Sequence, residues 1–159
     1  MGVRGPEDVQ RALDAFGLPI NVRHHSESAA TAPEAAQAAG SELGAIVKSL
    51  CFTVGEQPVL ILTAGDRRVD EKRVGALYGL SRKRVRMADR DTTIAVTGYE
   101  PGGVPPVGLA QNIPVLIDAA LGRYDTVHGA AGAANATFPI PFETLVEITG
   151  GKVVEISRE

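Results

Sequence analysis

Cysteine, tryptophan and aromatic side chains in general are scarce in this sequence. The 159 residues include one cysteine, no tryptophan and 4% aromatic residues. The single cysteine, Cys51, excludes an internal disulfide and any metal site built from several cysteines. Because Cys51 lies in an apolar run, we expect it to pack as a small hydrophobic side chain. The shortage of aromatic rings argues against a broad surface for stacking nucleic-acid bases.

Long apolar runs and a strong net charge are also absent. No apolar run approaches the ~20 residues of a membrane-spanning helix, and the N-terminal segment lacks a secretory apolar region. A net charge of −3 argues against a protein that grips long nucleic acid by charge alone, although it leaves room for binding the end of an RNA. We therefore expect a cytoplasmic protein that binds neither membrane nor DNA.

Common catalytic and cofactor motifs are missing as well. The sequence has no G-x-G-x-x-G after a first strand, no P-loop, no H-E-x-x-H and no G-x-S-x-G. His24 and His25 are adjacent, and on a strand their rings would point to opposite faces, which disfavours a shared metal. We expect no metal and no cofactor, so an enzyme of this sequence would act by positioning and by backbone electrostatics.

The order of predicted elements indicates one α/β domain over residues 1–159. The chain is 44% hydrophobic and long enough to bury a real core. Caps and apolar spacing predict helices at 6–16, 31–40, 70–79, 89–98 and 141–149. Apolar and β-branched runs predict strands at 20–25, 46–54, 59–64, 83–87, 113–117, from 126 towards 132, and 152–156. Strands and helices alternate without a strict βαβ rhythm, which favours one mixed sheet with helices packed around it.

Lys48 lies in the middle of the apolar strand predicted at 46–54. Alternation along a strand places Ile46, Lys48 and Leu50 on one face. Lysine is almost never fully buried without a partner, which leaves two interpretations. The amine reaches the sheet edge by snorkelling, or it lines a pocket and meets an anionic or electron-rich ligand.

The loop at 101–108 reads Pro-Gly-Gly-Val-Pro-Pro-Val-Gly. Three prolines and three glycines in eight residues exclude a helix or a central strand. Backbone N–H groups turned to one side of such a loop make an anion-binding nest or a hole for an oxyanion. The alternative is a rigid connector between a helix and a strand.

Three further features have both a functional and a structural interpretation. Asp118 ends a buried strand and belongs either to a site or to a local cap. His128 precedes a small-residue turn that allows close approach of a ligand, but it equally fits a hydrogen-bonded structural histidine. Eight basic residues form either a solvated face or a phosphate-contacting edge. These are Arg67, Arg68, Lys72, Arg73, Arg82, Lys83, Arg84 and Arg86.

Three segments, in this order and spacing, resemble the YbaK/EbsC family, whose members are relatives of the editing domain inserted in bacterial prolyl-tRNA synthetases. They are Ile-Val-Lys-Ser-Leu at 46–50, Gly-Tyr at 98–99 with the glycine-proline loop to 108, and Val-His-Gly-Ala-Ala-Gly at 127–132. The resemblance covers residues 8–156. It implies a compact α/β domain with a mixed, barrel-like sheet flanked by helices. It also implies hydrolysis, in trans, of the ester that joins a wrong amino acid to the acceptor end of tRNA, with a synthetase as a further candidate partner.

The resemblance also implies roles for individual residues. The catalytic set is Lys48, Gly102, Gly103, Val104, Pro106 and Gly108, with the loop amides holding the oxyanion. The substrate-binding set is Ile46, Leu50, Asp118, His128, Gly129 and Gly132. A small pocket favours alanine, serine, threonine, cysteine or proline, and His128 favours a hydroxyl-bearing substrate. Two alternatives remain: a non-catalytic module that binds aminoacyl-adenylate or aminoacyl-tRNA, and a structural domain in which the loop only connects.

Overall fold

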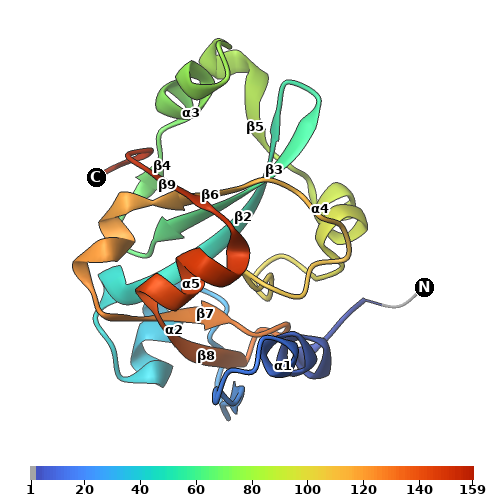
Figure 1. Cartoon of the computed structure of the whole chain (residues 1–159), viewed down its shortest axis with the longest axis vertical. Coiled ribbons are helices and arrows are strands. Elements are labelled where there is room, and N and C mark those ends of the chain that lie inside the picture. Colours follow the sequence, from blue (N-terminus) through green and yellow to red (C-terminus); the bar gives the residue numbers. More distant parts are fainter. Residues whose placement is uncertain (1–2) are drawn as a thin grey trace.

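Five α-helices and ten strands form within residues 3–159, which are the residues that the computed structural model describes (Figure 1). The helices are α1 (Pro6–Ala15), α2 (Ala32–Ala39), α3 (Glu71–Leu77), α4 (Arg90–Thr97) and α5 (Phe142–Thr149). The strands are β1 (Arg23–His24), β2 (Ile46–Val54), β3 (Gln57–Ala64), β4 (Arg68–Val69), β5 (Val85–Met87), β6 (Val115–Asp118), β7 (Thr126–Ala130), β8 (Ala136–Pro141), β9 (Lys152–Val154) and β10 (Ser157–Arg158). Short 3-10 turns occupy Leu43–Ala45, Arg82–Arg84 and Ala119–Arg123.

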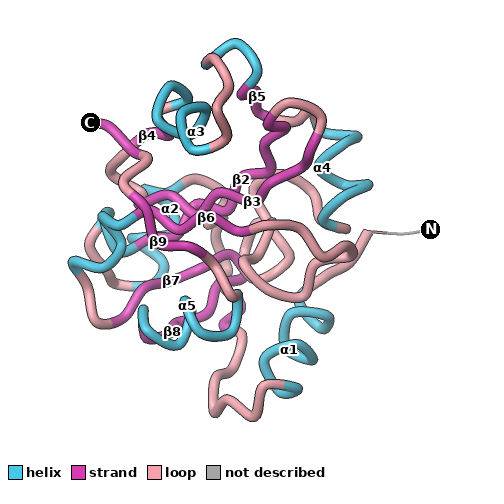
Figure 2. Tube along the Cα trace, turned by 45° about the horizontal axis from the view of Figure 1, so that its top comes forward, coloured by secondary structure: helices cyan, strands magenta, loops and turns pink. Residues whose placement is uncertain are grey.

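Eight of the strands form one mixed sheet. Its order is β1-β8-β7-β2-β3-β6-β9, with β5 paired to β2 as a branch, and β4 and β10 form a separate pair. β2 runs antiparallel to β3 and parallel to β7, while β3 and β6 are parallel. The predicted α/β domain with a mixed sheet and surrounding helices is confirmed. Figure 2 shows the helices distributed around the strands. No helix within residues 3–159 is long and apolar enough to cross a bilayer.

Helix caps and the central hairpin match the sequence prediction closely. Thr31 accepts a hydrogen bond from the Glu34 amide, Asp70 caps α3, and Asp89 caps α4. Such side-chain oxygens satisfy backbone N–H groups that have no partner inside the helix. β2 has the predicted bounds, and β3 follows it after a tight turn. The side chain of Cys51 is buried, as expected.

The strand β8 was not predicted, because Pro139 and Pro141 disfavour a strand assignment. β1 pairs only with Ala136 and Thr137 of β8. Beyond Thr137, therefore, β8 has a strand neighbour on the β7 side alone. A proline at such a locally unpaired edge has no ladder hydrogen bond to lose on the open side, which explains why the strand tolerates both prolines.

Alternation along β2 sends its side chains into three hydrophobic clusters. Val47 belongs to the main core, with Leu13 of α1 and Leu145 of α5. On the opposite face, Phe52 packs in a second cluster under α3, and Ile46 packs in a third with the alanines of α2. The middle of β2 lies between the second and third clusters.

The middle of β2 also lacks a strand neighbour on one side. The ladder to β7 covers only Ile46 and Val47, and the ladder to β5 begins at Phe52. β3 pairs with the whole of β2 on the other side. Residues 48–50 therefore face a gap in the sheet, and this gap positions the candidate site.

Candidate functional site

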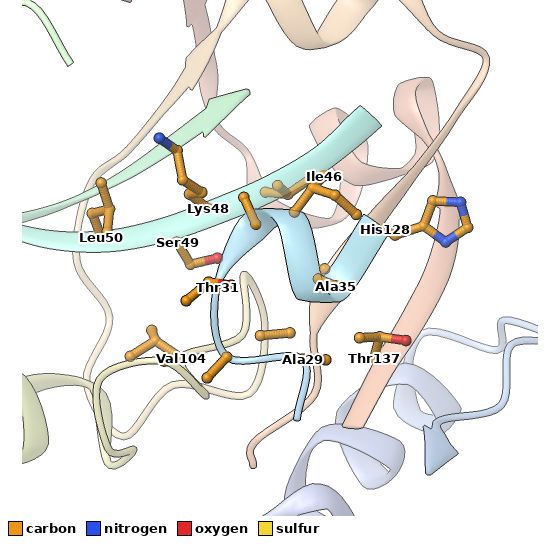
Figure 3. A pocket seen from close by; sticks show the side chains of 16 residues that line it. Ala29, Thr31, Ala35, Ile46, Lys48, Ser49, Leu50, Val104, His128 and Thr137 are labelled. Atoms are coloured by element: carbon orange, nitrogen blue, oxygen red, sulfur yellow. The ribbon is translucent and has the colours of Figure 1, made fainter. Parts of the chain in front are cut away.

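A cavity of about 200 Å³ lies against the gap beside β2. Its walls come from the segment that leads into α2, from β2 and β7, and from the glycine-proline loop (Figure 3). The lining residues are Ala29, Ala30, Thr31, Ala32, Ala35, Ile46, Val47, Lys48, Ser49, Leu50, Gly102, Val104, His128, Gly129, Ala130 and Thr137. Five of these residues are alanine, so much of the wall consists of small apolar side chains.

Gly129 lines the cavity, and Pro106 and Phe138 pack closely against it. A side chain at this position would place its Cβ 3.2 Å from Cδ of Pro106 and 3.4 Å from the ring of Phe138. Those contacts are tighter than or at the edge of ordinary van der Waals packing. Pro106 therefore supports the cavity wall without lining it, and it has no N–H to offer to a substrate.

Ser49 brings an unpaired hydroxyl to the cavity. Its Oγ is buried and has no hydrogen-bond partner within the described residues. Figure 3 shows this hydroxyl on the side of β2 that faces Thr31 and Val104. Ser49 is not among the site residues predicted from the sequence. The available signal was a polar residue at a position of β2 whose neighbours by alternation, Val47 and Cys51, are buried.

Lys48 lies on the other face of β2, at the border of the cavity. Its Nζ donates a hydrogen bond to the carbonyl oxygen of Arg67 at 2.6 Å. Burial lowers the pKa of the Lys48 amine, and the positive charge of Arg68 lowers it further, whereas Asp118 and Asp66 act in the opposite direction. Figure 3 shows the amine directed away from Thr31 and Val104. The amine therefore neither reaches only to solvent nor points into the alanine-lined part of the cavity.

Asp118 supports Lys48 from a distance and does not line the cavity. Its buried carboxylate accepts hydrogen bonds from the amides of Ala64 and Ala120 and from Oγ of Ser157 at 2.9 Å. Ser157 Oγ in turn accepts a 2.8 Å hydrogen bond from Nε of Arg67. Since the Arg67 carbonyl accepts from Lys48, this network fixes the acceptor that holds the lysine amine.

The glycine-proline loop contributes two residues to the cavity lining. Gly102 and Val104 line it, and their amides donate to no acceptor within residues 3–159. The amide of Gly103, in contrast, donates to the carbonyl of Glu100 at 3.0 Å. Gly102 has φ of +90° and faces Ala30, whose Cβ would lie 3.5 Å from a Cβ added to Gly102. The loop therefore lines the cavity with two residues whose amides have no acceptor in the described part of the chain.

Gly108 and Gly132 hold the loop in place from outside the cavity. The Gly108 carbonyl accepts a 2.7 Å hydrogen bond from the Tyr99 hydroxyl. The Gly132 amide donates to the Gly103 carbonyl at 2.9 Å. At Gly132, with φ of +88°, an added Cβ would lie 2.7 Å from the backbone of Gly5. Both glycines allow close backbone approach, and neither contributes an atom to the cavity lining.

His128 marks the end of the cavity that lies away from Val104 (Figure 3). Its Nδ1 is buried without a partner in the described residues. Burial lowers the pKa of the imidazole, with a smaller effect of the same sign from Arg23. Thr137 lies at the same end, and its hydroxyl is 2.7 Å from Nε2 of His25. A neutral imidazole and a fixed threonine hydroxyl thus provide polar groups at this end of the cavity.

Metal ligands do not cluster at the cavity. Residues 3–159 contain no group of three or more His, Cys, Asp or Glu side chains placed to hold a metal ion. The chemistry on offer is therefore two free loop amides, one unpaired hydroxyl, a neutral imidazole and a lysine amine at the border.

Comparison with known proteins gives consistent matches. The profile of the family described as "Aminoacyl-tRNA editing domain" matches residues 26–148. The chain is 36% identical over 134 residues to the uncharacterized protein YwhH of Bacillus subtilis, covering 84% of this chain and 83% of that protein. It is 29% identical over 136 residues, 84% of this chain and 81% of its relative, to the Enterococcus faecalis protein named "Putative Cys-tRNA(Pro)/Cys-tRNA(Cys) deacylase EbsC".

A solved structure agrees over nearly the whole chain. It is described as a "putative trans-editing enzyme for prolyl tRNA synthetase", and it is 35% identical with a TM-score of 0.90, covering 97% of both chains. The proline–tRNA ligase of Lactobacillus gasseri is 36% identical over 86 residues, which are 54% of this chain but 15% of the ligase.

Proposed function

Because the chain belongs to the aminoacyl-tRNA editing domain family, we propose that it hydrolyses the ester bond of misacylated aminoacyl-tRNA in trans. One observation carries the proposal. A cavity large enough only for a small side chain is lined by Gly102 and Val104, whose amides have no acceptor in the described residues, and by Ser49, whose hydroxyl is unpaired. Hydrogen-bond donors without internal acceptors, on residues that line a small cavity, support binding of a carbonyl oxygen that becomes negatively charged.

The loop amides serve the ester carbonyl. Water attacks the carbonyl carbon, the carbonyl oxygen becomes an oxyanion, and the amides of Gly102 and Val104 hold it. Removing one such donor costs about 2.7–4 kcal/mol in known enzymes. Of the loop residues in the catalytic set from the sequence, Gly103, Pro106 and Gly108 shape and fix the loop instead of contacting the ester, because the Gly103 amide is already paired and the other two do not line the cavity.

The protons move without a protein carboxylate, since no Asp or Glu lines the cavity. The C–O bond between the acyl group and the ribose oxygen breaks, and the ribose oxygen leaves with a proton that the attacking water supplies. The neighbouring ribose hydroxyl of the terminal adenosine lies next to the ester and relays that proton. Ser49 Oγ orients the attacking water or the ester by one hydrogen bond, as an unpaired buried hydroxyl is able to do.

Lys48 binds the nucleotide side of the ester. Its amine is directed away from the alanine-lined cavity and is held by the Arg67 carbonyl. In this position the positive charge meets the terminal ribose or phosphate of the RNA. Burial and Arg68 lower the pKa of the Lys48 amine. A general base would need a strongly lowered pKa, but a lysine that binds as a cation does not.

The amino-acid side chain occupies the end of the cavity near His128. A cavity of about 200 Å³ is below the ~300–1,000 Å³ of pockets for drug-sized ligands, which favours alanine, serine, threonine or cysteine. The neutral His128 imidazole provides a hydrogen bond to a hydroxyl-bearing side chain. An apolar pocket separates substrates that differ by one methylene by only about 1–3 kcal/mol, so we expect turnover of more than one small amino acid.

The test is deacylation of tRNA charged with alanine, serine, threonine, cysteine or proline, using tRNA(Pro) among the acceptors because relatives bear prolyl and cysteinyl names. Wild type is compared with Lys48→Ala. We expect hydrolysis of one or two of the misacylated tRNAs and its loss in the variant. Saturable binding of an aminoacyl-adenosine analogue without any turnover would instead identify a non-catalytic binding module.

A further inference from the structure

A second cavity of about 500 Å³ adjoins the first and shares Lys48 and Leu50 with it. Three arginines from separate segments line it: Arg68 of β4, Arg86 of β5 and Arg158 of β10. We call this cavity the arginine groove. Figure 2 shows α3, β4 and β5 near one another beside the sheet, and the C-terminal end that carries β10 close to β4.

Two of these arginines face each other directly. Arg68 and Arg158 are cross-strand partners in the antiparallel pair of β4 and β10. Like charges directly opposite each other destabilise a strand pair. Neither arginine forms an ion pair within residues 3–159, although Arg11, Arg73, Arg90 and Arg123 each do. A repulsive pair without a carboxylate is explained if an external anion lies between the two guanidinium groups.

The charges of the groove are predominantly positive. Arg86 donates from Nε to the carbonyl of Lys83 and has no carboxylate partner in the described residues. Glu71 is the one acidic residue in the lining, against Lys48 and the three arginines. The whole protein has a net charge of −3, so this local excess of positive charge is not a consequence of general composition.

The floor of the groove is apolar. Its apolar lining residues are Leu50, Phe52, Val69, Val85 and Met87. Met87 is 60% exposed, although it is a large hydrophobic side chain. A cationic rim over an apolar floor suits single-stranded nucleic acid, because phosphates meet the charges while a base covers the apolar surface.

We propose that the arginine groove binds the phosphates of the single-stranded 3′ end of an RNA, and so leads the ester at that end into the neighbouring cavity. The inference rests on the proposed function for the identity of the RNA. It goes beyond that function by assigning Arg68, Arg86 and Arg158 as phosphate-binding residues. Arg158 lies outside the basic cluster at 67–86 that the sequence singles out, and it reaches the groove only through the pairing of β10 with β4.

The first experiment measures binding of a short single-stranded RNA ending in CCA by fluorescence anisotropy at several salt concentrations. The variants are Arg68→Gln/Arg158→Gln and, separately, Arg86→Gln. Lys72→Gln is the matched control, since Lys72 is exposed on α3 and does not line the groove. Each phosphate contact on a single strand contributes about 0.7 to the slope of log affinity against log salt. A fourfold rise in salt therefore weakens binding about 2–3-fold per contact.

We expect the double variant to bind the RNA about tenfold or more weakly, because each hydrogen bond to a charged group contributes substantially to affinity. Its affinity should also depend less on salt. Lys72→Gln should bind like wild type. Removal of the repulsive pair should leave the melting temperature unchanged or higher, which separates loss of binding from loss of folding. Equal affinity of the double variant and wild type, an equal loss in Lys72→Gln, or no binding by wild type would each overturn the proposal.

A second experiment separates this inference from the proposed function. Deacylation is measured on misacylated tRNA and on the matching aminoacyl-adenosine, which carries the ester but no phosphate. We expect the double variant to lose turnover of the tRNA through a higher KM and to keep turnover of the nucleoside ester. If wild type hydrolyses neither ester while the RNA still binds through the arginines, the proposed function fails and the groove assignment stands. If the double variant loses both esters equally, the arginines do not act through phosphates.

Discussion

Replacing Ser49 by alanine should make the protein more stable and less active. The Ser49 Oγ is buried and has no partner in the described residues. A buried hydroxyl without a hydrogen bond costs about 1–3 kcal/mol. Alanine removes this cost and leaves a void of about one oxygen atom, so we expect the free energy of unfolding to rise by about 0.5–1 kcal/mol. For a domain of this length the melting temperature then rises by about 1–4 °C.

Activity should change in the opposite direction. If the hydroxyl orients water or the ester during hydrolysis, its removal costs the hydrogen bond that forms only with substrate present. We expect kcat/KM to fall by about tenfold or more, which corresponds to about 1.4 kcal/mol or more of lost transition-state stabilisation. The assay is deacylation of the best misacylated tRNA, with thermal or urea unfolding of the same preparation.

Thr63 offers a matched control. Its Oγ1 is also buried without a partner, and the residue is fully buried in β3, but it does not line the cavity. Thr63→Val should therefore raise stability by a similar amount and leave turnover unchanged. A loss of 1 kcal/mol or more of stability in Ser49→Ala, together with full activity, would show that the hydroxyl is paired in the folded protein and refute the reasoning.

Four further outcomes are expected. Lys48→Ala should abolish turnover of misacylated tRNA in the deacylation assay. Its melting temperature should stay within a few degrees of wild type, because removing the half-buried amine also removes the desolvation cost that lowers its pKa. Turnover of seryl- or threonyl-tRNA should fall on acidification only below the ordinary histidine pKa of 6.5, because burial and Arg23 lower the pKa of His128; Arg23→Gln should move this limb of the pH–rate profile to higher pH. The unfolded chain binds more protons at His128 below that pH, so the free energy of unfolding should fall as pH decreases through the same range. Asp118→Asn should destabilise the protein by about 1–3 kcal/mol in urea unfolding, since an amide cannot accept all three of the hydrogen bonds that the buried carboxylate accepts.

Much of the fold follows from local sequence signals. Thr31, Asp70 and Asp89 are the first residues of three predicted helices, because short polar side chains satisfy free N–H groups at the start of a helix, and all three do so. The strand 46–54 was predictable because its residues are apolar or β-branched between two turn signals. These signals depend on residues a few positions apart, so they can be read from the sequence alone. β8 was not predicted, because its prolines are tolerated only where β1 no longer pairs with it, beyond Thr137. That end of the pairing is a property of the sheet and not of the local sequence.

The candidate site was predicted in part. The motif at 46–50 and the glycine-proline loop were selected from the sequence, and the structure places Lys48, Gly102 and Val104 around one cavity. Which loop amides remain free was not predictable, because the pairing of the Gly103 amide with Glu100 depends on the turn that the loop adopts.

The sequence by itself determined most of the elements, the helix caps, the family and the order in which its motifs appear, since these depend on residue type and on neighbours within a few positions. The tertiary structure alone decided which side chains meet. Asp118 lies outside the cavity, and it is linked to Lys48 by hydrogen bonds through Ser157 and Arg67. Arg158 lies beside Arg68, although the two residues are far apart in the sequence. The tertiary structure also opened β2 between its two partial neighbours, because strand pairing stops and resumes at distances that no local pattern records.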